Sequence, residues 1–523
     1  MTVIRDIINT LRPFGSVAAI FFALFISLFF GISNRKWVKL FIVILSAISL
    51  SAALFLNIYT FLKVGDFSNF LFNFGLMQMI EVTIMLFSAL NIFIFISLFN
   101  IDKDHFVKLI MLFIATVSSA YFLILSNNFI AIFISFGIFT VGVFQLITVL
   151  NNNISKIKDY IIRFFLVSAV ALIIIFIGFS FIYGATDLKN FKQILESDSI
   201  SNPLIAIGLL MICLGIFLYL FIFPFQGNYL KILRRSDYSS PLIIWFLYMP
   251  AGLFMFLKMN NLIFYFIKKN NPYISIAFIV ISAACVLGGN IGAIKTTSLR
   301  RIFAFIFMAV IGLSILPYTM FGMGLITEAR VEWLIISNLI LLIISFFPLY
   351  GILVNIERNS QIDSIYNLKG FARTNKYLGI NLILILISFC GMIGTAGYLT
   401  KFYYFEPFIR YLNGELKLNS SPMSRILDMM ILFVIFAAVI FIIANVTRII
   451  IQLLKKTEQE DRQEDKKLET QSPEGNKKYL IFSKFYYLYV TVFNVIILII
   501  GVLGLLEVLN IGVGFIPFKI TSF

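Results

Sequence analysis

The sequence predicts an all-α, polytopic membrane protein with about 14 transmembrane helices. Its 523 residues are 60% hydrophobic and 13% charged, whereas soluble globular domains are nearer 45–50% apolar and about 25% charged. The mean hydropathy is +0.99. The apolar residues gather into runs long enough to cross a bilayer, which takes roughly 20 residues per helix. This composition excludes a soluble enzyme, a disordered chain, a collagen-like chain and a small disulfide scaffold.

Fourteen apolar runs are candidate transmembrane segments, and polar or charged residues separate them. In chain order they cover residues 13–32, 38–62, 70–99, 105–125, 129–150, 161–183, 203–223, 240–258, 273–293, 302–322, 331–353, 378–400, 427–453 and 479–507. Pro224, Pro241 and Pro250 interrupt or open segments seven and eight, because proline removes a backbone donor.

The positive charge predicts orientation in the membrane. The chain has 41 Lys and Arg against 25 Asp and Glu, a formal net charge of +16. Counted together with the charged residues at the adjoining segment ends, the connections after odd-numbered segments hold 25 Lys and Arg. Those after even-numbered segments hold 10 when Lys401 is assigned to segment 12. Since Lys and Arg concentrate in cytoplasm-side loops, the odd connections are expected on the cytoplasmic or matrix side and both termini on the other. The excess therefore indicates topology and gives no reason to expect a nucleic-acid partner.

Histidine and cysteine are too sparse to suggest a redox or metal centre within this chain. Cys213, Cys285 and Cys390 each stand alone in an apolar run, and His105 is the one histidine. No spacing typical of an iron–sulfur cluster or a zinc site is present. The first residues, MTVIRDIINTLRPFG, lack the pattern of a cleavable signal or a transit peptide. We therefore expect synthesis in a bacterium or inside an organelle.

Three stretches resemble the antiporter-like membrane-arm subunits of respiratory complex I. They are GNIGAIKTTSLRRIFAFIFMAVIG at 289–312, GTAGYLTKFYYFEPF at 394–408 and FPFQGNYLKILRRSDYSSP at 223–241. They are similar to the family's connection between helices nine and ten, its broken helix twelve and its Pro-Phe-His segment after helix seven. The Lys401-Phe402-Tyr403 run is closest to NADH dehydrogenase subunit 2, called subunit N in bacteria.

The resemblance implies an antiporter-like fold with broken helices near segments 7 and 12. It divides the chain into N-terminal helices 1–4, two antiporter-like repeats and C-terminal helices 13–14. The corresponding residues are 1–125, 126–258, 259–412 and 413–523. The charged stretch 455–478 is then a solvated connection between segments 13 and 14.

The resemblance also implies a function, partners and a location. The chain would be a core subunit of a proton-pumping NADH:ubiquinone oxidoreductase that contributes to energy coupling. NADH, FMN, iron–sulfur clusters and ubiquinone would be bound by partner subunits. The expected partners are antiporter-like subunits 4 and 5, the lateral helix of subunit 5, subunit 4L, accessory subunits and lipids. The mitochondrial inner membrane is the expected location, with the bacterial plasma membrane as the alternative.

Most of the family's central charged positions carry neutral residues in this chain. The resemblance places the Glu of helix five at Gly137, the Lys of helix seven at Tyr219 and the motif His at Gln226. It places the Lys of helix eight at Ala251 and the His of helix ten near Val310. No Lys, Glu, Asp or His lies in 129–150, 203–223 or 240–257, so a shift of one turn does not restore these charges.

A few ionisable side chains remain as candidates for proton translocation, because charged groups at membrane depth are costly and usually functional. Lys401 follows a break formed by Gly391, Gly394 and Gly397, and either exchanges protons or extends to the interface. The weaker candidates are Glu81 in segment 3 and Arg163 at the start of segment 6. Asp66 resembles the family's entry to helix three, and Glu406 is expected to pair with Arg410 one turn later.

Three functions remain open on this evidence. The chain is a pumping subunit of complex I, a structural subunit whose own channel is degenerate, or a free-standing cation/proton antiporter of the same fold. The missing charges favour the second function, a structural subunit with a degenerate channel. They count against the third function, a free-standing antiporter. The sequence leaves open whether this subunit itself moves protons.

Overall fold

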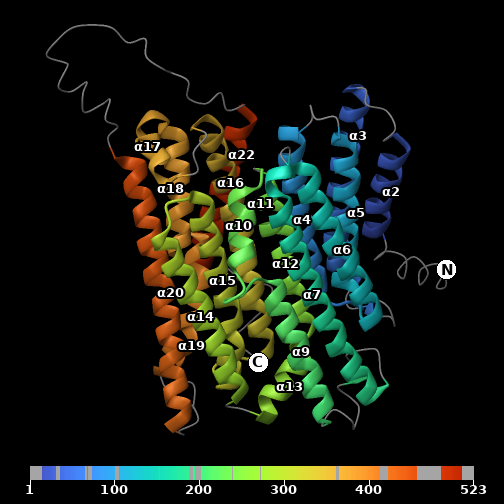
Figure 1. The fold of residues 1–523 in the computed structure, drawn as a ribbon. Coiled ribbons are helices and arrows are strands. Elements are labelled where there is room, and N and C mark those ends of the chain that lie inside the picture. Colours follow the sequence, from blue (N-terminus) through green and yellow to red (C-terminus); the bar gives the residue numbers. More distant parts are fainter. Residues whose placement is uncertain are drawn as a thin grey trace, which may run out of the picture. The chain divides into compact units, whose positions relative to one another are not determined.

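The structure is a computed structural model, and it is almost entirely helical (Figure 1). It describes residues 15–30, 36–64, 67–68, 73–100, 105–151, 154–187, 193–194, 202–237, 239–270, 273–360, 364–412, 422–455 and 484–508. Asp66 and nearly all of the charged stretch 455–478 lie outside these residues. The predicted all-α class is confirmed.

The chain folds as two compact units, Met1–Lys269 and Asn270–Phe523. This division falls close to the predicted boundary between the two repeats at 258/259. The finer division into four parts remains a prediction.

Unit 1 consists of long helices and one short strand pair. Its elements are α2 (Gly15–Phe30), α3 (Lys36–Val64), β1 (Phe67–Ser68), β2 (Asn73–Phe74), α4 (Leu76–Asn100), α5 (Phe106–Leu125), α6 (Phe129–Leu150), α7 (Ile154–Thr186), α9 (Pro203–Tyr219), α10 (Gly227–Arg235), α11 (Ser240–Ile243), the π-helical turn η3 (Ile244–Tyr248), α12 (Met249–Lys258) and α13 (Asn260–Asn270).

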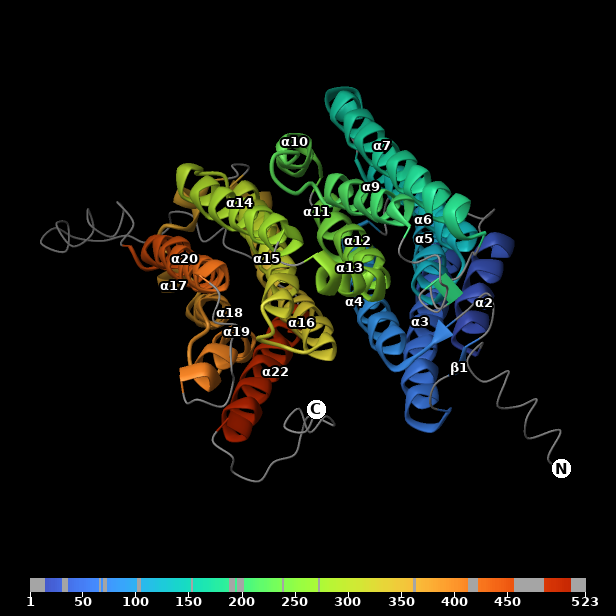
Figure 2. The same cartoon turned by 90° about the horizontal axis from the view of Figure 1, so that it is seen from below.

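The segment α11–η3–α12 is the buried centre of unit 1. Seen from below, it lies between α9 on one side and α4 on the other (Figure 2), and it contacts both helices. Every residue in the most apolar stretch of this segment is buried, whereas the outer helix α7 exposes a row of apolar side chains. The π-helical turn ends two residues before Pro250, whose missing backbone donor removes one α-helical hydrogen bond at this place.

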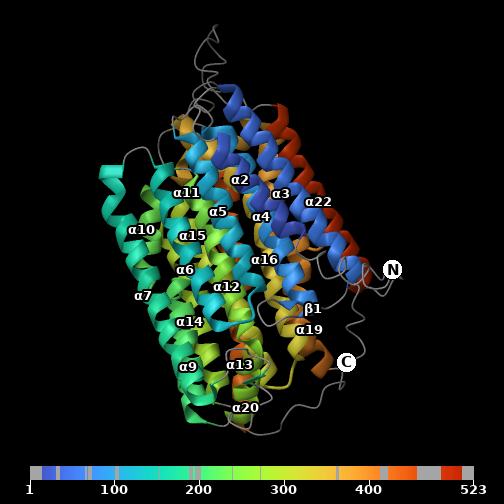
Figure 3. The ribbon, with the colours of Figure 1, turned by 90° about the vertical axis from the view of Figure 1, so that its right-hand side faces the viewer.

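Small residues bring α7 and α9 into backbone contact. A Cβ atom on Gly178 of α7 would lie 2.6 Å from the carbonyl oxygen of Gly208 of α9. Such close approach is typical of membrane helices, where packing rather than the hydrophobic effect drives association. The pair fixes one wall of unit 1. On another side of the unit α2 packs along α3 (Figure 3).

Unit 2 is also built from long helices. Its elements are α14 (Tyr273–Lys295), α15 (Leu299–Gly322), α16 (Glu328–Ser360), the 3₁₀ turn η4 (Ile365–Leu368), α17 (Phe371–Thr374), α18 (Lys376–Cys390), α19 (Ala396–Leu412), α20 (Pro422–Leu454) and α22 (Lys484–Val508). In one close pair, α14 and α15, a Cβ on Gly289 would meet the backbone of Phe305 and Ala309. Helix α22 packs against α16 and α19 (Figure 2).

Ten helices of the described chain are long and apolar enough to cross a membrane. Their positions agree with the predicted segments, apart from the ends. Segment 70–99 begins later than predicted, because β1 and β2 pair there in antiparallel register and α4 starts at Leu76. Segment 203–223 ends early, because α9 stops at Tyr219 and Phe221 has a positive φ of 52°.

Candidate functional site

The first interruption in a helical path lies in unit 1, where α9 ends at Tyr219 and α10 begins at Gly227. The Tyr219 side chain is fully buried. Its ring stacks on Tyr248 at a centroid distance of 4.1 Å and meets Phe136 of α6 at 4.5 Å. The interruption is therefore closed by packed aromatic rings.

Hydroxyl and indole groups supply the hydrogen bonds of this aromatic cluster. The Tyr248 hydroxyl is 2.7 Å from the Ser168 hydroxyl and donates to the Tyr219 carbonyl oxygen at 3.2 Å. Trp245 Nε1 donates to the Tyr229 hydroxyl at 2.7 Å. A tyrosine hydroxyl can pass a hydrogen bond along a chain, but it does not carry a positive charge as lysine does. The cluster therefore supplies no positive charge where the resemblance predicts a lysine.

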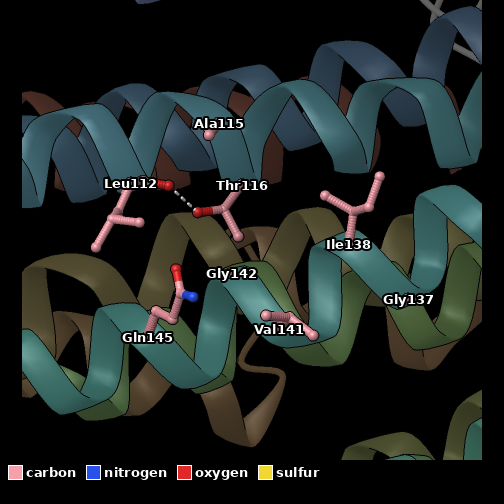
Figure 4. A pocket seen from close by; sticks show the side chains of 8 residues that line it. All are labelled: Leu112, Ala115, Thr116, Gly137, Ile138, Val141, Gly142 and Gln145. Carbon is pink, nitrogen blue, oxygen red and sulfur yellow. Dashed lines mark hydrogen bonds between the residues drawn. The ribbon is translucent and has the colours of Figure 1, made fainter. Parts of the chain in front are cut away.

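Gly137 lies on a different face of α6 from the residues that meet Tyr219. It lines a surface groove of about 380 Å³ between α5 and α6, together with Thr116, Gly142 and Gln145 (Figure 4). Phe136 and Thr140 of the same helix are buried and lie beside Tyr219. The structure thus does not bring Gly137 and Tyr219 together.

The other neutral positions are also spread over several surroundings. Gln226 is the residue before α10 and is partly exposed, while Ala251 is completely buried in α12. Val310 is buried in α15, in unit 2, and its carbonyl oxygen accepts a hydrogen bond from Ser314 at 3.1 Å. None of these three side chains can titrate. Their correspondence to the family's charged positions stays a prediction.

The second interruption lies in unit 2, where α18 ends at Cys390 and α19 begins at Ala396. Gly391 and Gly394 have φ values of +80° and +85°, which only glycine adopts without strain. Lys401 is partly buried, and its stem lies so close to Gly391 that a Cβ there would overlap Lys401 Cδ. The glycine-rich break thus makes room for the lysine stem.

Lys401 lies beside the end of α18. Its side chain is near Cys390, the last residue of that helix. The end of a helix presents unpaired carbonyl oxygens and the negative end of the helix dipole. The interruption of unit 2 therefore holds a lysine side chain, whereas that of unit 1 is filled by stacked tyrosine rings.

Two polar contacts hold the half of α19 that follows Lys401. Arg330 of α16 forms an ion pair with Glu406 of α19. Asn338 Nδ2 donates to the Tyr404 hydroxyl at 2.6 Å, and that hydroxyl donates to the Leu313 carbonyl oxygen at 2.9 Å. The sequence pointed to Arg410 as the partner of Glu406, and it did not reveal Arg330.

Glu81 and Lys258 are neighbours within unit 1, and sequence reasoning missed this pair. Glu81 of α4 is 3% exposed and lies near Lys258 at the end of α12. Lys258 Nζ also donates to the Ser126 carbonyl oxygen at 2.8 Å. Lys258 stands at the edge of an apolar run, so the sequence alone assigns it to the following connection. Arg163, by contrast, is exposed on α7, as an interface anchor would be.

The fold and the two interruptions define a class of antiporter-like membrane proteins, and the comparisons agree. Residues 126–416, more than half of the chain, match the family described as NADH:quinone oxidoreductase/Mrp antiporter, TM. The chain therefore belongs to this family, and the resemblance read from the sequence is confirmed.

Relatives with curated names are divergent but cover much of the chain. NADH-quinone oxidoreductase subunit N 1 of Thermodesulfovibrio yellowstonii is 23% identical over 67% of this chain and 75% of its own length. NADH-ubiquinone oxidoreductase chain 2 of Dictyostelium discoideum is 23% identical over 62% of this chain and 66% of its own.

Solved structures share the fold over nearly the whole chain. A chain of respiratory complex I from Thermus thermophilus superposes with a TM-score of 0.70 at 15% identity, covering 94% of this chain and 98% of that one. A chain of the Mrp complex from Dietzia sp. DQ12-45-1b gives 0.75 at 13% identity, covering 96% and 95%. At this identity the likeness establishes the fold alone.

Proposed function

We propose that this chain is a membrane-arm subunit of a proton-pumping NADH:quinone oxidoreductase, of the type called subunit N or chain 2. The proposal is supported mainly by the relatives with those names, which align with this chain along most of their length. A chain of respiratory complex I also shares the fold. The chain is a divergent subunit N, and it takes part in the enzyme's energy coupling. The redox groups NADH, FMN, iron–sulfur clusters and ubiquinone belong, in this proposal, to other subunits.

Fourteen transmembrane helices fit this role. Ten long apolar helices and four shorter ones, Gly15–Phe25, Pro203–Tyr219, Lys376–Cys390 and Tyr489–Leu503, give that number within the described chain. The two shorter helices Pro203–Tyr219 and Lys376–Cys390 stop at the interruptions. In this proposal α9–α10 and α18–α19 are the broken transmembrane helices seven and twelve, since broken helices inside a membrane line sites and paths.

Lys401 is the proton-exchanging residue of unit 2 in this proposal. It stands beside the break, is partly buried and lies at the negative end of α18. Ionisable residues at such places mark ion pathways in membrane proteins. Arg163 has no such setting and serves as an interface anchor.

The partners are the other membrane-arm subunits, including antiporter-like subunits 4 and 5 and subunit 4L, together with lipids. The relatives come from bacteria and from a eukaryote. The mitochondrial inner membrane is the proposed location, and the bacterial plasma membrane is the alternative.

Purification of the tagged chain from its own membrane tests this function. We expect it to co-purify with subunits that carry NADH oxidation and quinone reduction. A free-standing antiporter, favoured only by the shared fold with the Mrp complex, would purify without NADH:quinone reductase activity. That second outcome would contradict the proposal.

A further inference from the structure

The last described helix, α22, packs against both halves of the interrupted segment of unit 2 (Figure 2). Helix α18 is the half before the break, and α19 is the half after it. The contacts of α22 with the two halves differ in kind. One is a hydrogen-bonded amide pair, and the other is a contact between backbones.

The amide pair joins α22 to α18. Asn494 Nδ2 of α22 donates to Asn381 Oδ1 of α18 at 2.5 Å and to the Asn381 carbonyl oxygen at 3.2 Å. Asn381 Nδ2 donates in turn to the carbonyl oxygen of Tyr377 at 2.8 Å, one turn earlier in the same helix. Both asparagines are buried, at 4% and 6% exposed. Buried amides that hydrogen-bond across membrane helices fix the helices relative to each other.

Two turns further along α22, Gly501 touches the break itself. A Cβ atom at Gly501 would overlap the carbonyl group of Gly394 and the Cα atom of Thr395. Gly394 has a positive φ, and Thr395 is the residue before α19. Gly501 is buried. The backbone of α22 therefore lies directly against the turn that starts α19, and no side chain fits between them.

The Lys401 stem depends on the position of the same turn. Lys401 is the sixth residue of α19, and its Cδ lies where a Cβ of Gly391 would be. In the first turn of α19, the Gly397 backbone N–H donates to Ser388 Oγ of α18 at 3.3 Å. A short run of helix moves as a rigid element, so a shift at Thr395 is carried to Lys401.

We propose that Gly501 and Asn494 of α22 are positioning residues for Lys401. The amide pair fixes α22 on α18, and the glycine contact then fixes the start of α19 relative to α18. Lys401 is thereby held over Gly391, and α22 acts on proton transport through the position of this lysine. The inference rests on the proposed function, in which Lys401 exchanges protons.

Close packing of small residues alone makes a different prediction from positioning. If Gly501 serves packing alone, a larger residue there lowers the amount of assembled enzyme, and each assembled molecule moves the usual number of protons per NADH. If Gly501 positions Lys401, the number of protons moved per NADH falls in the molecules that do assemble. The ratio of protons to NADH therefore separates the two roles.

The test uses the assembled enzyme in lipid vesicles, with NADH oxidation and internal acidification followed together. Gly501→Ala adds the methyl group that the contact excludes, and we expect a loss of at least about threefold in protons moved per NADH, because misplaced reactive groups lose rate steeply. Asn494→Leu removes both hydrogen bonds to Asn381 at similar side-chain size and should lose about twofold. Val502→Ala shortens an exposed side chain of α22 and is the matched control, with a normal ratio expected.

Lys401→Met supplies the decisive comparison. If Gly501 acts through Lys401, adding Gly501→Ala to Lys401→Met lowers the ratio no further, since both changes affect one function. Additive losses, or a normal ratio in the Gly501→Ala enzyme, would overturn the inference. If Gly501→Ala does not assemble, Asn494→Leu decides in the same way, alone and combined with Lys401→Met. A normal ratio in Lys401→Met would instead refute the proposed role of Lys401, so the two failures are distinguishable.

Discussion

The interruptions of unit 1 and unit 2 show two ways to fill the same architectural feature. In unit 1 the end of α9 is closed by Tyr219 stacked on Tyr248. In unit 2 the end of α18 holds Lys401, whose stem lies over Gly391. The first is a packed aromatic core, and the second makes room for a lysine stem. The difference teaches that an interruption between two helices can be filled by aromatic rings in one unit and by a lysine side chain in the other.

The largest effect is expected from placing a lysine at the interruption of unit 1, as Lys401 stands at the interruption of unit 2. Tyr219→Lys would place an unpaired ammonium in a fully buried aromatic stack. We expect a loss of about 4 kcal/mol in stability, enough to prevent assembly. The amount of assembled enzyme in membranes measures this. Tyr219→Phe is the matched control, and normal assembly of Tyr219→Lys would show that the site tolerates charge.

A valine at the break of unit 2 should be nearly as harmful. Gly391→Val forces a β-branched residue into positive φ and collides with the Lys401 stem. The expected cost is about 3 kcal/mol, measured as a lower midpoint of thermal unfolding. Gly137→Ala is the control, because its Cβ would meet nothing within 4 Å. A Gly391→Val variant as stable as Gly137→Ala would refute the described break.

Removal of the charge partner on α19 should have a moderate effect. Glu406→Gln leaves Arg330, which is 8% exposed, without its carboxylate. We expect a destabilisation of about 2 kcal/mol, seen in the unfolding midpoint. The double variant Arg330→Met with Glu406→Gln should recover part of the loss. Equal loss in single and double variants would argue against a direct pair.

The smallest effect concerns the hydrogen bond that orients Tyr404. Asn338→Ala removes the donor to the Tyr404 hydroxyl, but that hydroxyl keeps its bond to the Leu313 carbonyl oxygen. The expected cost is about 1 kcal/mol, measurable by thermal unfolding. Tyr404→Phe removes both bonds and should cost more. The opposite order would mean that Asn338 acts through another contact.

The sequence predicted the helices well because apolar length alone identifies a transmembrane segment. The sequence did not predict which face of each helix points into the fold. Helices that are apolar nearly all round have no hydrophobic periodicity that marks a buried face. For this reason the sequence did not show that Phe136 and Thr140, and not Gly137, meet Tyr219.

Pairs formed across the fold were also beyond sequence reasoning. Lys401 could be found because the sequence around it resembles the family's broken helix twelve, and glycines mark the break before it. Glu81 and Lys258 are far apart in the chain, and only the packing of α4 against α12 brings them together. Glu406 likewise pairs with Arg330 of another helix. Local spacing cannot reveal such contacts.

The contrast between the two interruptions is tested most directly by NADH-driven proton transport in vesicles that contain the enzyme with Lys401→Met. We predict normal assembly and a loss of about tenfold in proton transport, whereas Tyr219→Phe should transport protons at close to the normal rate. An assembled Lys401→Met enzyme that pumps as well as the wild type would contradict the account.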